Sequence, residues 1–132
     1  MRIRDTWRAR VYRAENAAFA CYDQAPRMSW PEVERFVAKV CKAEKRNAPR
    51  LGHGQGAKRP IAFSNRIVLP KFARKRVIIL HELAHYFTPP PASWHGEDWA
   101  GMYFYLISKY IGETEAKVMS MAFNQFGVYG KT

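Results

Sequence analysis

The sequence has few cysteines, few acidic residues and no long apolar run. Its 132 residues include two cysteines, Cys21 and Cys41, without the C-x-x-C spacing of redox and zinc motifs. Two cysteines cannot form a disulfide framework, so we expect reduced, mostly buried thiols in a cytoplasmic protein. No apolar run approaches the roughly 20 residues of a membrane-spanning helix, and Met1 is not followed by the apolar segment of a signal peptide. We therefore expect no membrane association and one domain over residues 1–132.

The scarcity of acidic residues leaves an uneven positive charge. The chain carries 22 lysines and arginines against 11 acids, a net charge of +11. Residues 1–76 hold 19 basic and 6 acidic residues, whereas residues 77–132 hold 3 and 5. A cationic surface attracts polyanions, so non-specific contact with nucleic acid is a hypothesis for the N-terminal part. No base-stacking or base-reading motif stands out. The basic residues assigned to phosphate contact are Arg8, Arg13, Lys39, Lys42, Lys45, Arg74, Lys75 and Arg76.

Apolar periodicity and stop signals predict five helices and a small sheet, which is an α+β domain. The helices are expected over residues 5–22, from 29 onward, and over 70–87, 97–110 and 113–126; two strands are expected over 60–63 and 66–69 as a hairpin. Ser29 and Glu32 have the spacing of a capping box for the second helix. The prolines after Thr88 end the third helix, Gly127 ends the fifth, and the glycine-rich segment 47–60 is expected to be a hairpin or a loop.

The third predicted helix carries the motif H-E-x-x-H at residues 81–85. His81 and His85 are four residues apart, so both imidazoles lie on one helix face and can reach one Zn²⁺. Glu82 lies about 100° around the helix from His81, so its carboxylate can take a proton from zinc-bound water rather than ligate the metal. Because the surrounding residues are apolar, the helix is expected to be buried, and buried polar groups need partners such as a metal.

A catalytic zinc needs a third protein ligand and an open fourth position. His95 is the leading candidate, because it follows a rigid three-proline bend at the mouth of the next helix, and Gly96 permits a close backbone approach. A carboxylate from the fifth helix is an alternative, and so is the lone histidine of the glycine-rich segment, which is expected to be exposed. These alternative ligands are Glu113, Glu115 and His53. Tyr103 and Tyr105 lie near His95 in sequence but are expected in the core.

The motif residues resemble those of known zinc peptidases, the zincins. H-E-x-x-H followed by His95-Gly96-x-x-Trp99 looks like SprT-like metallopeptidases, whereas the metzincin extension is absent because residue 91 is proline rather than histidine. Residues 8–15, 67–70, 95–96 and 126–128 are similar to a family of small metallohydrolases of actinobacteria and their phages. The resemblance implies a minimal zincin-like fold, zinc ligation by three histidines and a catalytic glutamate, at His81, His85, His95 and Glu82. SprT-like enzymes commonly cleave DNA-attached proteins.

The leading interpretation is therefore a zinc metallohydrolase and, more specifically, a metallopeptidase acting on a protein or peptide substrate. The strand at 66–69, before the active helix, is expected to pair with an extended substrate. One alternative is a non-catalytic, basic nucleic-acid-binding protein with a structural, four-ligand zinc site. A weaker alternative is an interaction protein on a zincin scaffold.

Overall fold

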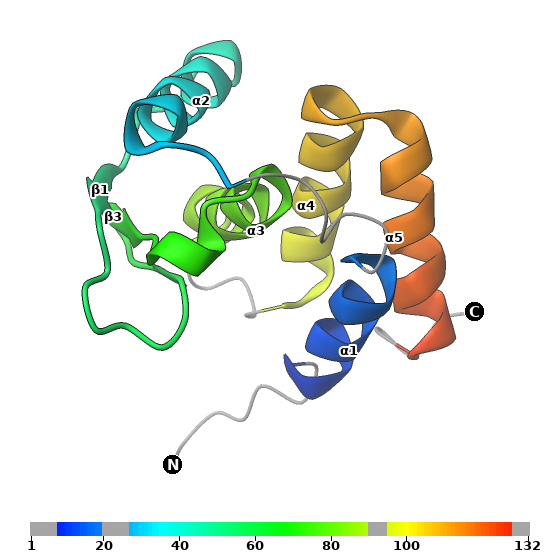
Figure 1. The fold of residues 1–132 in the computed structure, drawn as a ribbon. Coiled ribbons are helices and arrows are strands. Elements are labelled where there is room, and N and C mark those ends of the chain that lie inside the picture. Colours follow the sequence, from blue (N-terminus) through cyan, green and yellow to red (C-terminus); the bar gives the residue numbers. More distant parts are fainter. Residues whose placement is uncertain (1–7, 20–26, 90–94, 128–132) are drawn as a thin grey trace. The chain divides into compact units, whose positions relative to one another are not determined.

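The computed structural model describes residues 8–19, 27–89 and 95–127, apart from the side chains of Arg8 and Phe19 (Figure 1). The elements in chain order are α1 (Arg8–Phe19), α2 (Trp30–Ala43), β1 (Arg50–Gly52), β2 (Ile61–Ala62), β3 (Arg66–Val68), the 3₁₀ turn η1 (Lys71–Ala73), α3 (Arg76–Phe87), α4 (Glu97–Tyr110) and α5 (Glu113–Gln125). The α+β class is thus confirmed. The chain forms two compact units, one of residues 25–86 and the other of residues 1–24 with 87–132. The expectation of one domain over residues 1–132 stays a prediction.

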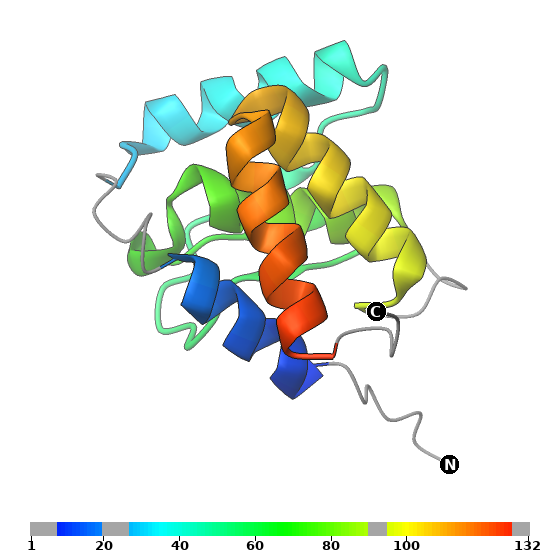
Figure 2. The same cartoon turned by 90° about the vertical axis from the view of Figure 1, so that its right-hand side faces the viewer.

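The unit of residues 1–24 and 87–132 is helical and contains α1, α4 and α5. Helix α5 contacts both other helices, and Figure 2 shows α4 and α5 running antiparallel from the turn at Gly112. Its core holds an aromatic cluster in which Trp99 stacks on Tyr103, with ring centroids 5.0 Å apart, and Phe123 meets Phe104 edge-on at 5.0 Å. Gly127 has φ of 68°, which confirms the predicted glycine stop after α5.

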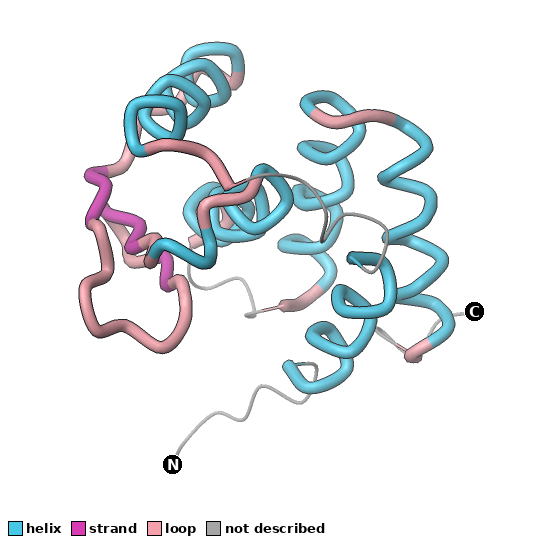
Figure 3. The backbone as a smooth tube through the Cα atoms, viewed as in Figure 1, coloured by secondary structure: helices cyan, strands magenta, loops and turns pink. Residues whose placement is uncertain are grey.

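The unit of residues 25–86 contains the small sheet with α2 and α3. Its strand order is β1-β3-β2, with β1 parallel and β2 antiparallel to β3 (Figure 3). The hairpin of β2 and β3 was predicted, whereas β1 falls in the segment 47–60, which was expected to be a hairpin or a loop and pairs with β3 instead. Because β3 is the central strand, neighbours occupy both of its edges. The expectation that the 66–69 strand pairs with an extended substrate is therefore wrong.

Helix α2 begins as its sequence predicts. The Ser29 hydroxyl accepts a hydrogen bond from the Glu32 amide at 3.3 Å, and the Glu32 carboxylate accepts one from the Ser29 amide at 2.9 Å. These bonds satisfy amides that the helix leaves open, and they hold the pKa of Glu32 below its usual value. The buried side of α2 is Val33, Phe36, Val37, Val40 and Cys41.

The third helix begins later than predicted. Pro70 caps the short turn η1, and α3 begins only at Arg76. Arg74 interrupts the helical path with φ of −86° and ψ of 55°, and its side chain turns back to bond the Leu69 carbonyl at 3.1 Å. In the described part of the chain, no helix has the length and apolar character needed to cross a membrane.

Candidate metal centre

The H-E-x-x-H motif lies in the middle of α3, as predicted. His81 and His85 are one turn apart, and their rings meet edge-on with centroids 5.0 Å apart. His81 is 5% exposed, whereas His85 is half-buried. Apolar residues cover most sides of the helix, and several of them, such as Ile79 and Leu80, are fully buried. A buried helix therefore presents both imidazoles on one face.

Glu82 is buried beside the first of these histidines. Glu82 is only 6% exposed, and its Oε2 lies 3.8 Å from Nε2 of His81. Glu82 lies beside His81 but is not a member of the three-histidine group, a position that fits a group that moves a proton rather than a metal ligand.

His95 immediately precedes α4 and has an unusual backbone. Its φ is 54°, in the left-handed region, whereas Gly96 has an ordinary φ of −82° as the N-cap of α4. The imidazole is 3% exposed and meets two rings edge-on, Trp99 at 4.7 Å and Tyr12 at 5.7 Å. These aromatic contacts fix the ring of His95 from α1 and from α4.

A buried carboxylate supports this aromatic wall, and sequence reasoning missed it. Glu15 on α1 is 4% exposed and accepts a hydrogen bond from the Tyr103 hydroxyl at 2.9 Å. Tyr103 in turn stacks on Trp99. The signal available in the sequence was an acid on the apolar side of the first helix. Tyr103 is in the core as expected, whereas Tyr105 is 46% exposed, contrary to expectation.

The three predicted histidines lie close enough to hold a metal ion. One ligand atom each from His81, His85 and His95 falls within 4.8 Å of the others, and these three residues make up the whole group among the described residues. Glu113, Glu115 and His53 are not members of it. Three imidazole nitrogens suit zinc and several other transition metals.

Burial favours the neutral forms of two side chains, Tyr86 on α3 and Cys41 on α2. The Tyr86 hydroxyl donates to the Asn47 carbonyl at 2.7 Å, and burial raises the pKa of Tyr86. Burial also raises the pKa of Cys41 to about 11. Cys21 lies outside the described residues.

The basic residues assigned to phosphate contact differ in their exposure. Arg13, Lys39, Lys42, Lys45 and Arg76 are exposed, and Lys75 is half-buried. Arg74 is buried, with its guanidinium bonded to backbone carbonyls. The side chain of Arg8 lies outside the described part.

Comparisons of the chain with protein-family models, with curated proteins and with solved structures find no match. The SprT-like resemblance therefore stays a prediction that rests on the motif residues.

Proposed function

We propose that this chain is a zinc-dependent hydrolase and, more specifically, a metallopeptidase. The observation that carries the proposal is the group of three histidines, whose ligand atoms lie within 4.8 Å of one another, with the buried Glu82 beside His81. Three protein ligands are typical of catalytic zinc sites, which keep a fourth position for water or substrate.

The residues of the site would have different roles, either in binding the metal or in transferring a proton. His81, His85 and His95 would hold the ion, and the rings of Tyr12 and Trp99 would keep His95 in its orientation. A bound zinc ion acidifies water and polarises a substrate carbonyl. Glu82 would accept the proton released as a peptide carbonyl is attacked and return it to the leaving amine.

The alternative of a structural zinc in a non-catalytic protein needs a closed site. Structural sites usually have four protein ligands, commonly including cysteines. Among the described residues the group has three members, and Cys41 is not one of them. This ligand count favours the catalytic interpretation.

Glu82→Gln tests the role of the carboxylate. We expect this variant to bind one zinc per chain, as measured by metal analysis, and to lose about 10²–10⁴-fold of its casein-hydrolysing activity, the typical contribution of a general base. Glu34→Gln, at an exposed position of α2, is the matched control and should retain full activity. His95→Ala should lose the metal.

Two results would contradict the proposal. Full casein hydrolysis by the zinc-loaded Glu82→Gln variant would remove Glu82 from the mechanism. A wild-type protein that holds one zinc but hydrolyses neither casein nor a mixed peptide library would support the structural-zinc alternative.

A further inference from the structure

The positive charge of the chain belongs almost entirely to one unit. Residues 25–86 contain 14 basic and 4 acidic residues, a net charge of +10, whereas the helical unit contains 8 and 7. Charge of this density on 62 residues attracts a polyanion at long range. Charge alone does not say where on the unit such a ligand would bind, so a contact with more specific chemistry is needed.

Such a contact lies in a three-residue stack that the sequence analysis did not find. The His53 ring lies over the Trp30 ring with centroids 3.8 Å apart and planes 25° apart. The Arg74 guanidinium lies over the same indole, with its carbon 4.6 Å from the ring centroid. The three residues come from the start of α2, the position directly after β1 and the segment before α3, which explains why no local motif revealed them.

Arg74 fixes the imidazole in place. Its Nη2 lies 3.3 Å from the His53 carbonyl oxygen and 3.4 Å from Nδ1 of the His53 ring. Because arginine can only donate, Nδ1 of His53 is the acceptor in this contact. Arg74 is 91% buried, whereas His53 is exposed, so a rigid base supports an accessible ring. A fixed aromatic ring loses little conformational entropy when a ligand stacks on it.

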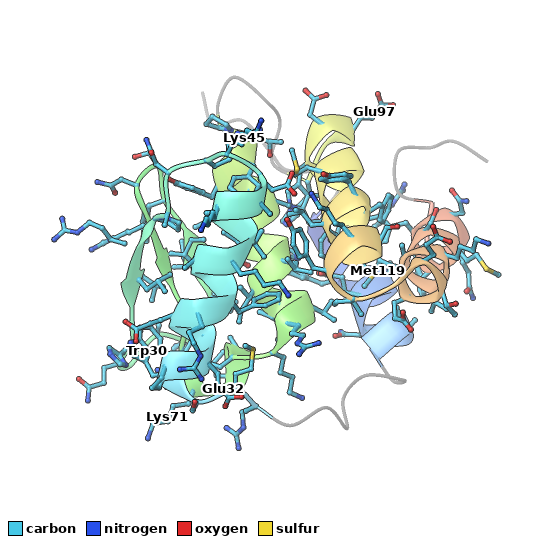
Figure 4. The ribbon with its side chains drawn as sticks, turned by 90° about the horizontal axis from the view of Figure 1, so that it is seen from above. Trp30, Glu32, Lys45, Lys71, Glu97 and Met119 are labelled. Carbon is cyan, nitrogen blue, oxygen red and sulfur yellow. The ribbon has the colours of Figure 1, made fainter. Side chains whose placement is uncertain are left out.

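An exposed lysine lies at the same end of the unit as this stack (Figure 4). Figure 4 shows Trp30 and Lys71 at the same end of the unit, with Glu32 next to them. Lys71 is exposed, and the adjacent Phe72 is 48% exposed. Glu32 is engaged in the capping box, and its charge is offset by Arg35 and Arg76.

We propose that this end of the unit binds single-stranded nucleic acid, with a base stacked on the face of His53 that Trp30 does not cover. The net charge of +10 supplies attraction to the phosphates, and Lys71 contacts a phosphate beside the stacked base. A base inside a duplex has its faces covered, so this site selects single strands. The site shares no residue with the three-histidine group, so its existence does not depend on the hydrolase activity.

His53→Ala, in the full-length protein, tests the stacking contact. The probe is a fluorescein-labelled, 20-nucleotide oligothymidylate, and its binding is followed by fluorescence anisotropy across a series of salt concentrations. We expect His53→Ala to weaken binding by about 5- to 100-fold, the loss of one base–aromatic stack. The dependence on salt should not change, because stacking releases no counterions. His53→Tyr, which keeps an aromatic ring, should restore most of the affinity.

Lys71→Gln and a matched aromatic variant complete the test. Lys71→Gln should lower the slope of log affinity against log salt by about 0.7, the value for one phosphate contact on a single strand. Tyr105→Ala removes another exposed aromatic ring that has a lysine beside it, Lys109 with Nζ 3.2 Å from the hydroxyl, but in the unit of low net charge. This control should bind as tightly as the wild type.

Three results would overturn the proposal. The first is unchanged affinity in a folded His53→Ala variant. The second is binding of a 20-base-pair duplex as tightly as the single strand. The third is an equal loss in Tyr105→Ala, which would show that any exposed ring contributes. Folding is checked independently by circular dichroism, so a loss caused by unfolding is recognised.

Discussion

His95 combines burial with a backbone conformation that residues with a Cβ rarely adopt. A non-glycine residue at φ of 54° carries strain on the order of 1–3 kcal/mol, which the surrounding structure must offset. Edge-on packing against Trp99 and Tyr12 provides part of that offset. A glycine would adopt this conformation without strain. The presence of histidine at this position therefore indicates that its imidazole serves the molecule, which agrees with the proposed ligand role.

Cys41 is expected to be an inert thiol until the solution becomes alkaline. Burial raises its pKa to about 11 from a usual value of 9.0, so little thiolate forms in the folded protein at pH 8. In a Cys21→Ser background, we expect Cys41 to react slowly with a disulfide reagent at pH 8 and rapidly in concentrated guanidinium. A rate in the folded protein equal to that in denaturant would show that the thiol is accessible.

The same shift makes stability depend on pH in one direction. The unfolded thiol ionises above about pH 9 while the folded thiol remains neutral, so its contribution to the free energy of unfolding declines as pH rises from 9 through 11. The urea midpoint should fall over this range, and it should fall less in Cys41→Ala.

The loop between β1 and β2 is held by one close approach of its backbone to β3. Gly54 and Gly56 both have positive φ, 67° and 77°. A Cβ on Gly54 would lie 2.8 Å from Cγ1 of Val68 and 2.9 Å from the backbone nitrogen of Pro70, whereas a Cβ on Gly56 would meet nothing within 4 Å. Gly56→Ala should therefore cost about 1–2 kcal/mol of left-handed strain. Gly54→Ala should cost about 1–3 kcal/mol more from overpacking.

Urea denaturation of the two variants measures this difference directly. Gly56→Ala serves as the matched control, because it shares the backbone strain without the steric contact. Equal midpoints for the two variants would show that the loop relaxes away from Val68 and Pro70.

Elements specified by their own residues were predicted well from the sequence. Helix α2 has a capping box, an apolar stripe and a proline in its first turn, all of them local signals, and it begins at the predicted capping box. Strand β1 has only three residues in a glycine-rich segment, so its pairing with β3 left no local pattern. The delayed start of α3 depends on Arg74 reaching the Leu69 carbonyl, a tertiary contact.

The same distinction applies to the candidate sites. The spacing of His81 and His85 is a local helical signal, and the downstream His95 followed from chemistry that requires a third ligand. The buried Glu15 and the stack of Trp30, His53 and Arg74 join residues far apart in the chain. Such contacts are fixed by the tertiary fold, so no sequence window contains them.

At the scale of the whole molecule, the positive charge and the proposed metal site depend on different sets of residues. Charge is concentrated in residues 25–86, whereas the three-histidine group depends on a few buried side chains. High salt should therefore weaken polyanion binding while leaving metal binding nearly unchanged, because screening acts mainly on exposed charges.

Zinc should stabilise the folded chain, because the histidines come together only when it is folded. A ligand at about 1,000 times its dissociation constant adds about 4 kcal/mol to the free energy of unfolding. We expect the urea midpoint to rise when zinc is added to protein stripped with a chelator, and His95→Ala should abolish that rise. His53→Ala, which removes an exposed histidine outside the group, should keep it. If the stripped wild type unfolds at the same urea concentration with and without zinc, the three histidines do not form a metal site.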